Sequence, residues 1–263
     1  MANTTWHRMP DRGGGAVGVG EMGEVNVNTI YVPKGKAKEY GDYALNIYTG
    51  CPHRCYYCFA PNVLHRDRET FHADVRPRKG IVEATRKRLE QGDVTDKLIH
   101  LCFTCDPYPT GHDSTPTREI IKLLKERGNH VQILTKNPAD ASRDFDLMDR
   151  NDWFGVTLTG ATVKQEPGST NQKKWLSRIT AARHFGIKTW VSFEPVINAE
   201  WVLSCIAMHG EIFDKIKIGK LNYWLSEINW SEFGTKAEAL CKERGFDYYI
   251  KDGLRAEMMH GGR

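Results

Sequence analysis

Three of the seven cysteines lie within eight residues, in the segment CPHRCYYC. They are Cys51, Cys55 and Cys58, spaced CxxxCxxC, and they follow directly on a predicted strand. Three thiolates on one short loop can hold three corners of a cubane iron–sulfur cluster, whereas most such clusters use four cysteines. The missing fourth ligand would leave one iron open to bind another molecule, as in a catalytic metal site.

The alternative is that the same cysteines bind a structural zinc ion, with His53 or Cys102 as the fourth protein ligand. Zinc sites usually contain paired CxxC units. Here the spacing is CxxxCxxC, followed by an aromatic residue, Phe59. The pattern therefore favours the iron–sulfur cluster and keeps zinc as the alternative.

The composition is that of a folded chain, which excludes collagen, a charge-driven disordered chain and a disulfide knot. Of 263 residues, 40% are hydrophobic, and the net charge is 37 − 33 = +4. The N-terminal segment MANTTWHRMPDRGGG lacks the apolar core of a secretory signal. No stretch approaches the roughly 18 apolar residues of a membrane span. We expect no membrane association and a reducing, cytoplasmic location, where clustered cysteines more often serve metal or redox chemistry than disulfides.

Short strand-like segments alternate with helical patterns from Tyr43 onward. The expected strands are Tyr43–Tyr48, Leu98–Thr104, His130–Thr135, Trp153–Leu158, Lys188–Phe193 and Lys215–Gly219. The expected helices are Lys79–Gln91, Pro116–Arg127, Ala141–Arg150, Gln172–Phe185, Glu200–His209 and about Thr235–Arg244. Six such units predict an α/β fold with a parallel sheet, either an open doubly wound sheet or a complete or partial barrel. Asp247–Lys251 could add a seventh strand.

Alternation along the strands separates polar from apolar side chains. His100 and Cys102 fall on one face of the second strand, and Ser192 and Glu194 share a face of the fifth. Helices can cover the apolar faces. The polar faces are then expected to line a central cavity near the C-terminal strand ends, where barrel enzymes hold their sites.

The cysteine segment, read as CPHRCYYCF, resembles the cluster motif of the radical S-adenosylmethionine (SAM) superfamily. The segments NIYTGCPHRCYYCFAP, FTCDPYP, ILTKN, GVTLTG and GIKTWVSFEPVI occur in the order used by its spore photoproduct lyase-like branch. The resemblance covers roughly residues 40–220. It implies a partial (β/α)6 TIM-type barrel, so we expect a core barrel over residues 26–220. A flexible Gly-rich arm at 1–25 would precede it, and an extension at 221–263 would pack on or cap it.

The resemblance also implies cofactors and a reaction. The cofactors are a [4Fe–4S] cluster and SAM, and the electron comes from a donor such as flavodoxin or ferredoxin. SAM would be cleaved to methionine and a 5′-deoxyadenosyl radical, which abstracts hydrogen from a substrate. The metal ligands implied are Cys51, Cys55 and Cys58. The residues expected to bind SAM are Tyr57, Phe59, Asp106, Lys136, Thr157, Thr159 and Glu194. For Lys136, Thr157 and Glu194, a plain structural role stays open.

Cys102 and Cys105 form a CxxC pair in CFTCDPYP and are the candidate catalytic residues. In the spore photoproduct lyase-like branch, a cysteine near this strand end donates a hydrogen atom. Aligning the aspartate of that motif with Asp106 puts the donor position on Phe103. Cys102 or Cys105 could still serve as donor, and the alternative is that both are structural.

Three functions follow from these observations. The first is a radical SAM enzyme with an unidentified substrate, and the second is repair of a DNA photolesion. The third is a non-catalytic zinc or iron–sulfur protein. Aromatic residues in the segment 222–234 and basic residues after the cysteines are compatible with nucleic acid as a partner.

Overall fold

Seven parallel strands form the centre of the protein. The computed structural model describes residues 29–260, apart from the side chains of residues 171–173 and 260. Each strand pairs with the strand that precedes it in the chain, so the order is β1 to β7. This order excludes the doubly wound sheet, in which the strand order reverses. The strands are β1 Tyr43–Leu45, β2 Leu98–Leu101, β3 His130–Thr135, β4 Trp153–Thr157, β5 Lys188–Phe193, β6 Lys215–Ile218 and β7 Tyr248–Ile250.

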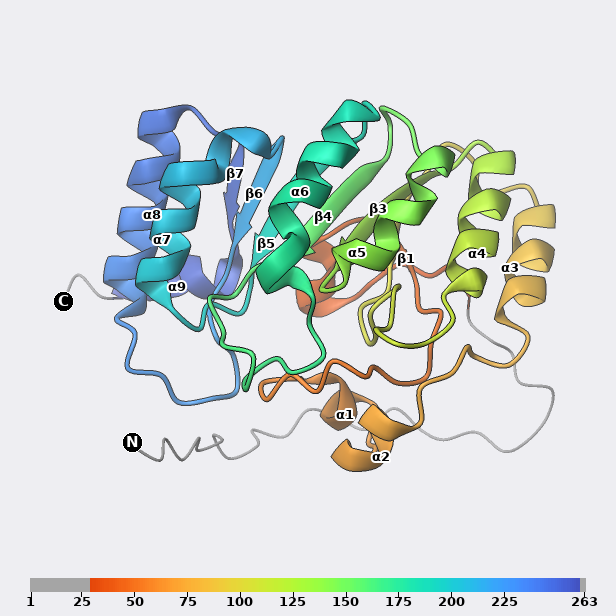
Figure 1. The fold of residues 1–263 in the computed structure, drawn as a ribbon, viewed down its shortest axis with the longest axis horizontal. Coiled ribbons are helices and arrows are strands. Elements are labelled where there is room, and N and C mark those ends of the chain that lie inside the picture. Colours follow the sequence, from red (N-terminus) through yellow and green to blue (C-terminus); the bar gives the residue numbers. More distant parts are fainter. Residues whose placement is uncertain (1–28, 261–263) are drawn as a thin grey trace.

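The helices that connect the strands lie on one side of the curled sheet (Figure 1). The longer helices are α3 Ile81–Glu90, α4 Thr115–Glu126, α6 Asn171–His184, α7 Ala199–His209, α8 Trp230–Arg244 and α9 Asp252–His260. The shorter ones are α1 Ala60–Val63, α2 Arg68–Ala73 and α5 Pro138–Ala141, with 3-10 turns η1 Gly35–Glu39, η2 Ser142–Leu147 and η3 Gly210–Ile212. Right-handed crossovers put the connecting helices on the outer face. The predicted partial barrel is confirmed, with β7 as an additional strand.

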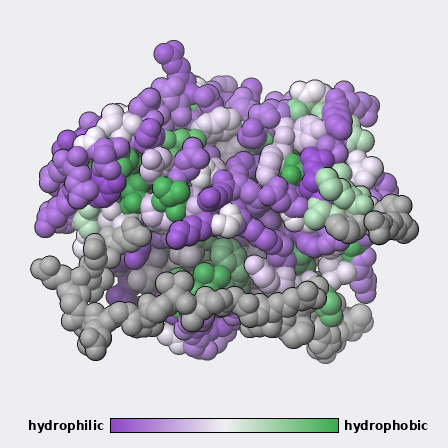
Figure 2. All heavy atoms as spheres, turned by 180° about the vertical axis from the view of Figure 1, so that it is seen from behind, coloured by the Kyte–Doolittle hydropathy of each residue, from purple (hydrophilic) through white to green (hydrophobic). Residues whose placement is uncertain are grey.

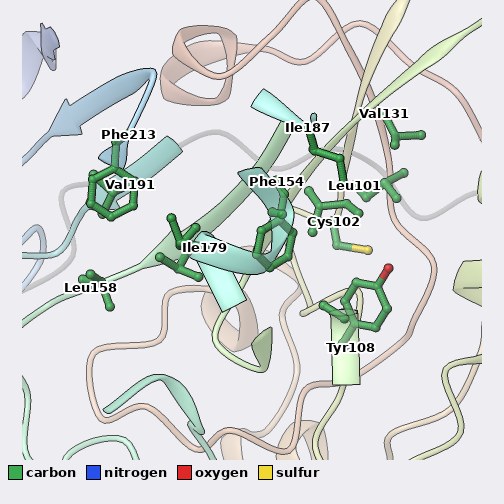
Figure 3. Close-up of a cluster of buried hydrophobic side chains, with 14 of the residues drawn as sticks. Leu101, Cys102, Tyr108, Val131, Phe154, Leu158, Ile179, Ile187, Val191 and Phe213 are labelled. Carbon is green, nitrogen blue, oxygen red and sulfur yellow. The ribbon is translucent and has the colours of Figure 1, made fainter. Parts of the chain in front are cut away.

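The core lies between the sheet and these helices. β2, β3, β4 and β5 contribute Leu101, Val131, Phe154 and Val191 to one buried cluster (Figure 3). Each of these side chains is fully buried. Burying a side chain of this size stabilises the fold by about 1.5–3 kcal/mol. The apolar face of each strand is thereby fixed toward the helices, and the polar face is turned inward.

Most predicted element boundaries agree with the structure to within a few residues, and two helices differ. The helix expected over Ala141–Arg150 is instead α5 followed by the 3-10 turn η2. The last predicted helix begins at Trp230 rather than Thr235, because the Asn229 side chain caps it by accepting from the Glu232 amide at 3.1 Å. Helices α1, α2 and α9 were not predicted, since the first two are too short to show a helical period.

The concave face of the sheet is filled by the residues that precede β1. Tyr40, which follows η1, has its ring 5.4 Å from that of His100 and 6.0 Å from that of Trp190, measured between centroids. Gln132 donates to the Tyr40 carbonyl at 2.8 Å. Since these partners belong to β2, β5 and β3, Tyr40 lies inside the curl of the sheet.

The C-terminal region continues the barrel sheet. Residues 221–263, expected as an extension, contain α8, α9 and the strand β7, which pairs with β6. The arm expected at residues 1–25 lies outside the described residues. The surface opposite the helices is mainly hydrophilic (Figure 2). Within the described part of the chain, no helix is long and apolar enough to cross a membrane.

Candidate active site

The segment that contains the three clustered cysteines, here called the thiol loop (residues 51–58), lies between β1 and α1. Burial raises the pKa of the Cys55 thiol to about 12, and burial also raises the pKa values of Cys51 and Cys58. The nearby Cys55 and Cys58 raise the pKa of Cys51 further, so the three thiols lie near one another. Thiols held neutral by burial become good ligands once a metal replaces their protons.

The three cysteine sulfurs are not all within 4.8 Å of one another, so they do not form a closed zinc site in this structure. Tetrahedral ligation at about 2.3 Å would bring the sulfurs within about 4 Å of each other. Among the described residues, the one group of three ligand atoms within 4.8 Å of one another is His130, Asp149 and Asp152. The two residues considered as a fourth zinc ligand make other contacts in this structure. His53 Nε2 lies 3.0 Å from the Thr110 hydroxyl, and the Cys102 thiol is hydrogen-bonded to Cys105. The cubane cluster therefore stays the prediction for the thiol loop.

The acid group that organises the site is Glu166, which the sequence analysis did not identify. Glu166 is 3% exposed. Its Oε1 accepts hydrogen bonds from the Tyr57 hydroxyl and, at 2.9 Å, from the Thr159 hydroxyl. The same oxygen lies 3.5 Å from Lys136 Nζ. Three residues predicted to bind SAM from separate segments therefore meet at one buried carboxylate.

Tyr57 links this group to the thiol loop. Its hydroxyl is also hydrogen-bonded to the Cys55 thiol, and burial raises the Tyr57 pKa far above its usual value. The Lys136 ammonium lies 5.6 Å from the centre of the Tyr57 ring, within the range of a cation–π contact. One continuous polar group, here called the Glu166 group, thus lies at the C-terminal ends of the strands and consists of Cys55, Tyr57, Glu166 and Lys136.

Asp106 supports Lys136 from the other side. It is 7% exposed, and its two oxygens accept from the Thr135 hydroxyl at 2.6 Å and from the Lys136 amide at 2.7 Å. The Tyr108 amide also donates to it, at 2.9 Å. The carboxylate of Asp106 therefore fixes the loop after β2 to the end of β3. This contact sets the position of the Lys136 backbone, from which the side chain extends.

A pocket of about 240 Å³ opens beside the Glu166 group. It is lined by Thr157, Leu158, Thr159, Gly160, Ala161, Glu166, Trp175 and Trp201. Thr157 and Thr159 thus reach the same pocket, as the resemblance implies. Trp175 and Trp201, from α6 and α7, give the pocket an aromatic wall that the sequence did not suggest.

Glu194 lies apart from the Glu166 group, inside the barrel. It forms an ion pair with Lys251, and its Oε2 accepts from the Tyr40 hydroxyl at 2.9 Å. Asn222 donates to its other oxygen at 3.3 Å. The structure therefore does not bring Glu194 to the other predicted SAM-binding residues. Phe59 is also outside the pocket and 44% exposed.

The prediction that Cys102 lies on the same face as His100 is wrong. Cys102 has φ = 72°, in the left-handed region, and strand pairing ends at Leu101. The reversal turns its side chain into the hydrophobic cluster beside Tyr108 (Figure 3). The Phe103 ring takes the inner position instead, stacked on His100 with centroids 4.3 Å apart.

The two cysteines of the CxxC pair are nevertheless neighbours. The Cys102 thiol is hydrogen-bonded to Cys105, and burial, followed by this hydrogen bond, raises the Cys102 pKa well above its usual value. Cys105 is only partly buried. Of the two thiols, Cys105 is the more exposed.

Comparisons with known proteins give one family and one fold. The model of the radical SAM superfamily matches residues 45–199. A variant of spore photoproduct lyase has a TM-score of 0.64 at 11% identity, over 84% of this chain and 79% of that chain. Spore photoproduct lyase complexed with dinucleoside spore photoproduct has a TM-score of 0.55 at 14% identity, over 81% and 64% of the two chains.

A third structure comes from another enzyme. Streptococcus suis SuiB bound to S-adenosylmethionine has a TM-score of 0.56 at 11% identity, over 79% of this chain and 50% of that chain. No curated protein matches the sequence. At these identities the structural likeness concerns the fold alone.

Proposed function

The chain belongs to the radical SAM superfamily, and from this premise we propose that the thiol loop and the Glu166 group together cleave SAM to begin radical chemistry on a substrate. The superfamily consists of enzymes that use a [4Fe–4S] cluster and SAM. The observation that carries the proposal is the Tyr57 hydroxyl, which is hydrogen-bonded to both Cys55 and Glu166. These two hydrogen bonds connect the Cys55 thiol to Glu166, which lines the pocket.

In this proposal Cys51, Cys55 and Cys58 ligate three irons of the cluster. When bound, a reduced cluster and SAM would supply the chemistry of the reaction, which is one-electron cleavage of SAM to methionine and a radical able to abstract hydrogen from a substrate. The cofactors supply this chemistry, and the protein binds, orients and shields them. Cys55 is buried, and Cys51 and Cys58 are partly buried, which limits the access of water to the ligand sulfurs.

The residues around Glu166 would bind SAM. Lys136 offers a compact ammonium for the SAM carboxylate, and Glu166 and Asp106 hold it in place. Thr157 and Thr159 offer hydroxyls from the pocket wall. Tyr57 fixes the distance between the pocket and the cluster, because it contacts both Cys55 and Glu166.

The electron that starts the reaction comes from a donor protein, which radical SAM enzymes require. We propose flavodoxin or ferredoxin in a reducing cytoplasm. Phe59 and Val63 beside the thiol loop are 44% and 60% exposed, which makes them accessible to such a partner.

Anaerobic purification and reconstitution test the proposal. We expect about four irons and four sulfides per chain, and 5′-deoxyadenosine after addition of SAM and dithionite. Zinc without sulfide, or a reduced cluster that forms no 5′-deoxyadenosine, would contradict it. Tracking deuterium from candidate substrates into 5′-deoxyadenosine would then identify the hydrogen that is abstracted.

Repair of a DNA photolesion is the second candidate. The shared fold with spore photoproduct lyase and the partly buried Cys105 support it. In this candidate, Cys105 would return a hydrogen atom to the substrate radical. An oligonucleotide that carries spore photoproduct should then be repaired by wild type and not by Cys105→Ala. Absence of wild-type turnover removes this candidate and leaves the SAM-cleavage proposal intact.

A further inference from the structure

One short helix, α2, faces the thiol loop with two nitrogen donors. Arg68 and His72 are four residues apart, so their side chains project from the same side of the helix. In the ribbon, α1 and α2 lie together below the sheet (Figure 1). Both side chains are hydrogen-bonded to backbone carbonyls of the thiol loop, so α2 contacts the segment that contains the three cysteines directly.

Arg68 binds three of these carbonyls with one guanidinium. It donates to the carbonyl of Tyr56 at 2.9 Å, to that of Cys58 at 3.2 Å and to that of Cys55. Two of the three belong to cysteines of the loop. A planar guanidinium is suited to such contacts, because its five N–H donors have fixed directions.

The charge of Arg68 is not neutralised by a carboxylate. Among residues 29–260, no aspartate or glutamate lies within ion-pair distance of its guanidinium. The neighbouring Arg54 and Arg66 differ in this respect, because they pair with Glu69 and Asp74. The positive charge of Arg68 is therefore available to the negative charge that the three thiolates and a cluster would bring.

His72 is hydrogen-bonded to the backbone of the first cysteine, Cys51. Its Nδ1 lies 2.7 Å from the Cys51 carbonyl, and because a carbonyl only accepts, Nδ1 must carry the proton. The ring is 4% exposed, and its Nε2 is buried with no hydrogen-bond partner among the described residues. The imidazole is therefore held in one orientation against the start of the thiol loop.

Helix α2 is itself fixed to the chain before the loop. The Asp67 side chain caps it by accepting from the Thr70 amide at 2.8 Å. A Cβ on Gly50 would come within 2.3 Å of the Phe71 carbonyl, so only glycine allows the helix to pack this closely on the residue before Cys51. The two donors thus act from a rigid support.

We propose that Arg68 and His72 are positioning residues that hold the thiol loop in its ligating shape, and that the Arg68 charge favours the reduced cluster. The inference rests on the proposed function, because it concerns the cluster bound there. Groups around the ligands of a metal site orient those ligands and tune the metal. A nearby positive charge favours the state with one more electron.

The cluster potential is the first test. In reconstituted Arg68→Met we expect the reduction equilibrium to shift about tenfold toward the oxidised cluster, which corresponds to about 59 mV for one electron. EPR-monitored redox titration measures this directly. Arg68→Lys should keep most of the wild-type potential. Arg54→Met is the matched control, since Arg54 lies within the thiol loop but pairs with Glu69 at the surface, and we expect no shift.

Retention of the cluster is the second test. Arg68→Lys and His72→Phe should lose iron to a chelator about tenfold faster than wild type, because the carbonyl contacts are gone. His72→Asn, which restores a donor near the Nδ1 position, should recover most of the difference. If Arg68→Met fails to fold by circular dichroism, Arg68→Lys and the His72 pair carry the test.

The two proposals can fail separately. Wild-type protein that takes up no cluster overturns the proposed function and this inference with it. A second outcome overturns the inference alone. Wild type then takes up a cluster, but Arg68→Met and His72→Phe have the same cluster potential and the same rate of iron loss as wild type.

Discussion

Two glutamates near strand ends of the same barrel have opposite surroundings. Glu166 receives hydroxyl donors from Tyr57 and Thr159, and its nearest cation, Lys136, is 3.5 Å away beside a pocket. Glu194, inside the barrel, is paired directly with Lys251. Both carboxylates have a lysine partner, but the first lines a pocket and the second lies inside the barrel.

The difference shows that a polar residue at a strand end is not sufficient to define a ligand site. Lys251 also pairs with Glu39 at 3.2 Å, and its ammonium lies 4.2 Å from the Tyr40 ring centre. These contacts join β5, β7 and the segment before β1. The Glu194 region therefore connects separate parts of the barrel, whereas the Glu166 region is the part that we propose binds SAM.

The largest effect is expected from removing a cluster ligand. Cys55→Ala should abolish the cluster and reduce 5′-deoxyadenosine formation to background, because two cysteines no longer hold the cubane. Iron and sulfide assays with product analysis measure both. Cys241→Ala, a buried cysteine of α8, is the control and should retain the cluster. A Cys55→Ala protein with full iron content would contradict the assignment.

The next effect concerns the Glu194 region. Lys251→Met should lower the free energy of unfolding by about 3–5 kcal/mol, because it leaves Glu194 and Glu39 without their common partner. Denaturant unfolding measures the change. Lys215→Met, which breaks the exposed pair with Asp247, should cost less than about 1 kcal/mol. Equal losses in both variants would argue against a buried ion pair.

Glu166→Gln tests the other region. We expect SAM binding to weaken by about 10- to 100-fold, because the neutral amide no longer attracts the Lys136 ammonium and its hydrogen bonds from Tyr57 and Thr159 are no longer charge-assisted. Equilibrium binding of SAM to the reconstituted protein measures this. The identical change at Glu194 should leave SAM affinity unchanged and lower the unfolding free energy. The reverse pattern would exchange the roles of the two carboxylates.

The last prediction is a pH dependence inside the barrel. Burial, with the nearby Lys217 and Lys251 charges, lowers the pKa of His100 to about 3. The unfolded chain, with an imidazole pKa near 6.5, then binds more protons than the folded chain between about pH 3 and 6.5. The contribution of His100 to the free energy of unfolding is therefore fully present above about pH 6.5 and is lost as the pH falls toward about 3. Relative to His100→Gln, wild type should lose about 1.4 kcal/mol per pH unit in this window. Parallel curves for the two proteins would refute the assignment.

The sequence predicted the strands and the thiol loop because both are local patterns. His130–Thr135 and Lys188–Phe193 agree with the structure at both ends. Glu166 was not predicted, since it lies in a loop without periodicity and meets Tyr57 across 109 positions of the chain. Cys102 was misassigned because a positive φ is uncommon outside glycine, asparagine and aspartate, and alternation assumes that it is absent.

The central claim is that SAM meets an open iron beside the Glu166 group. The most direct measurement is the EPR spectrum of the reduced, reconstituted protein with and without SAM. We expect SAM to change the cluster signal in wild type and in Glu194→Gln, and we expect Glu166→Gln to need a higher SAM concentration for the same change. A wild-type signal that saturating SAM leaves unaltered would contradict the account.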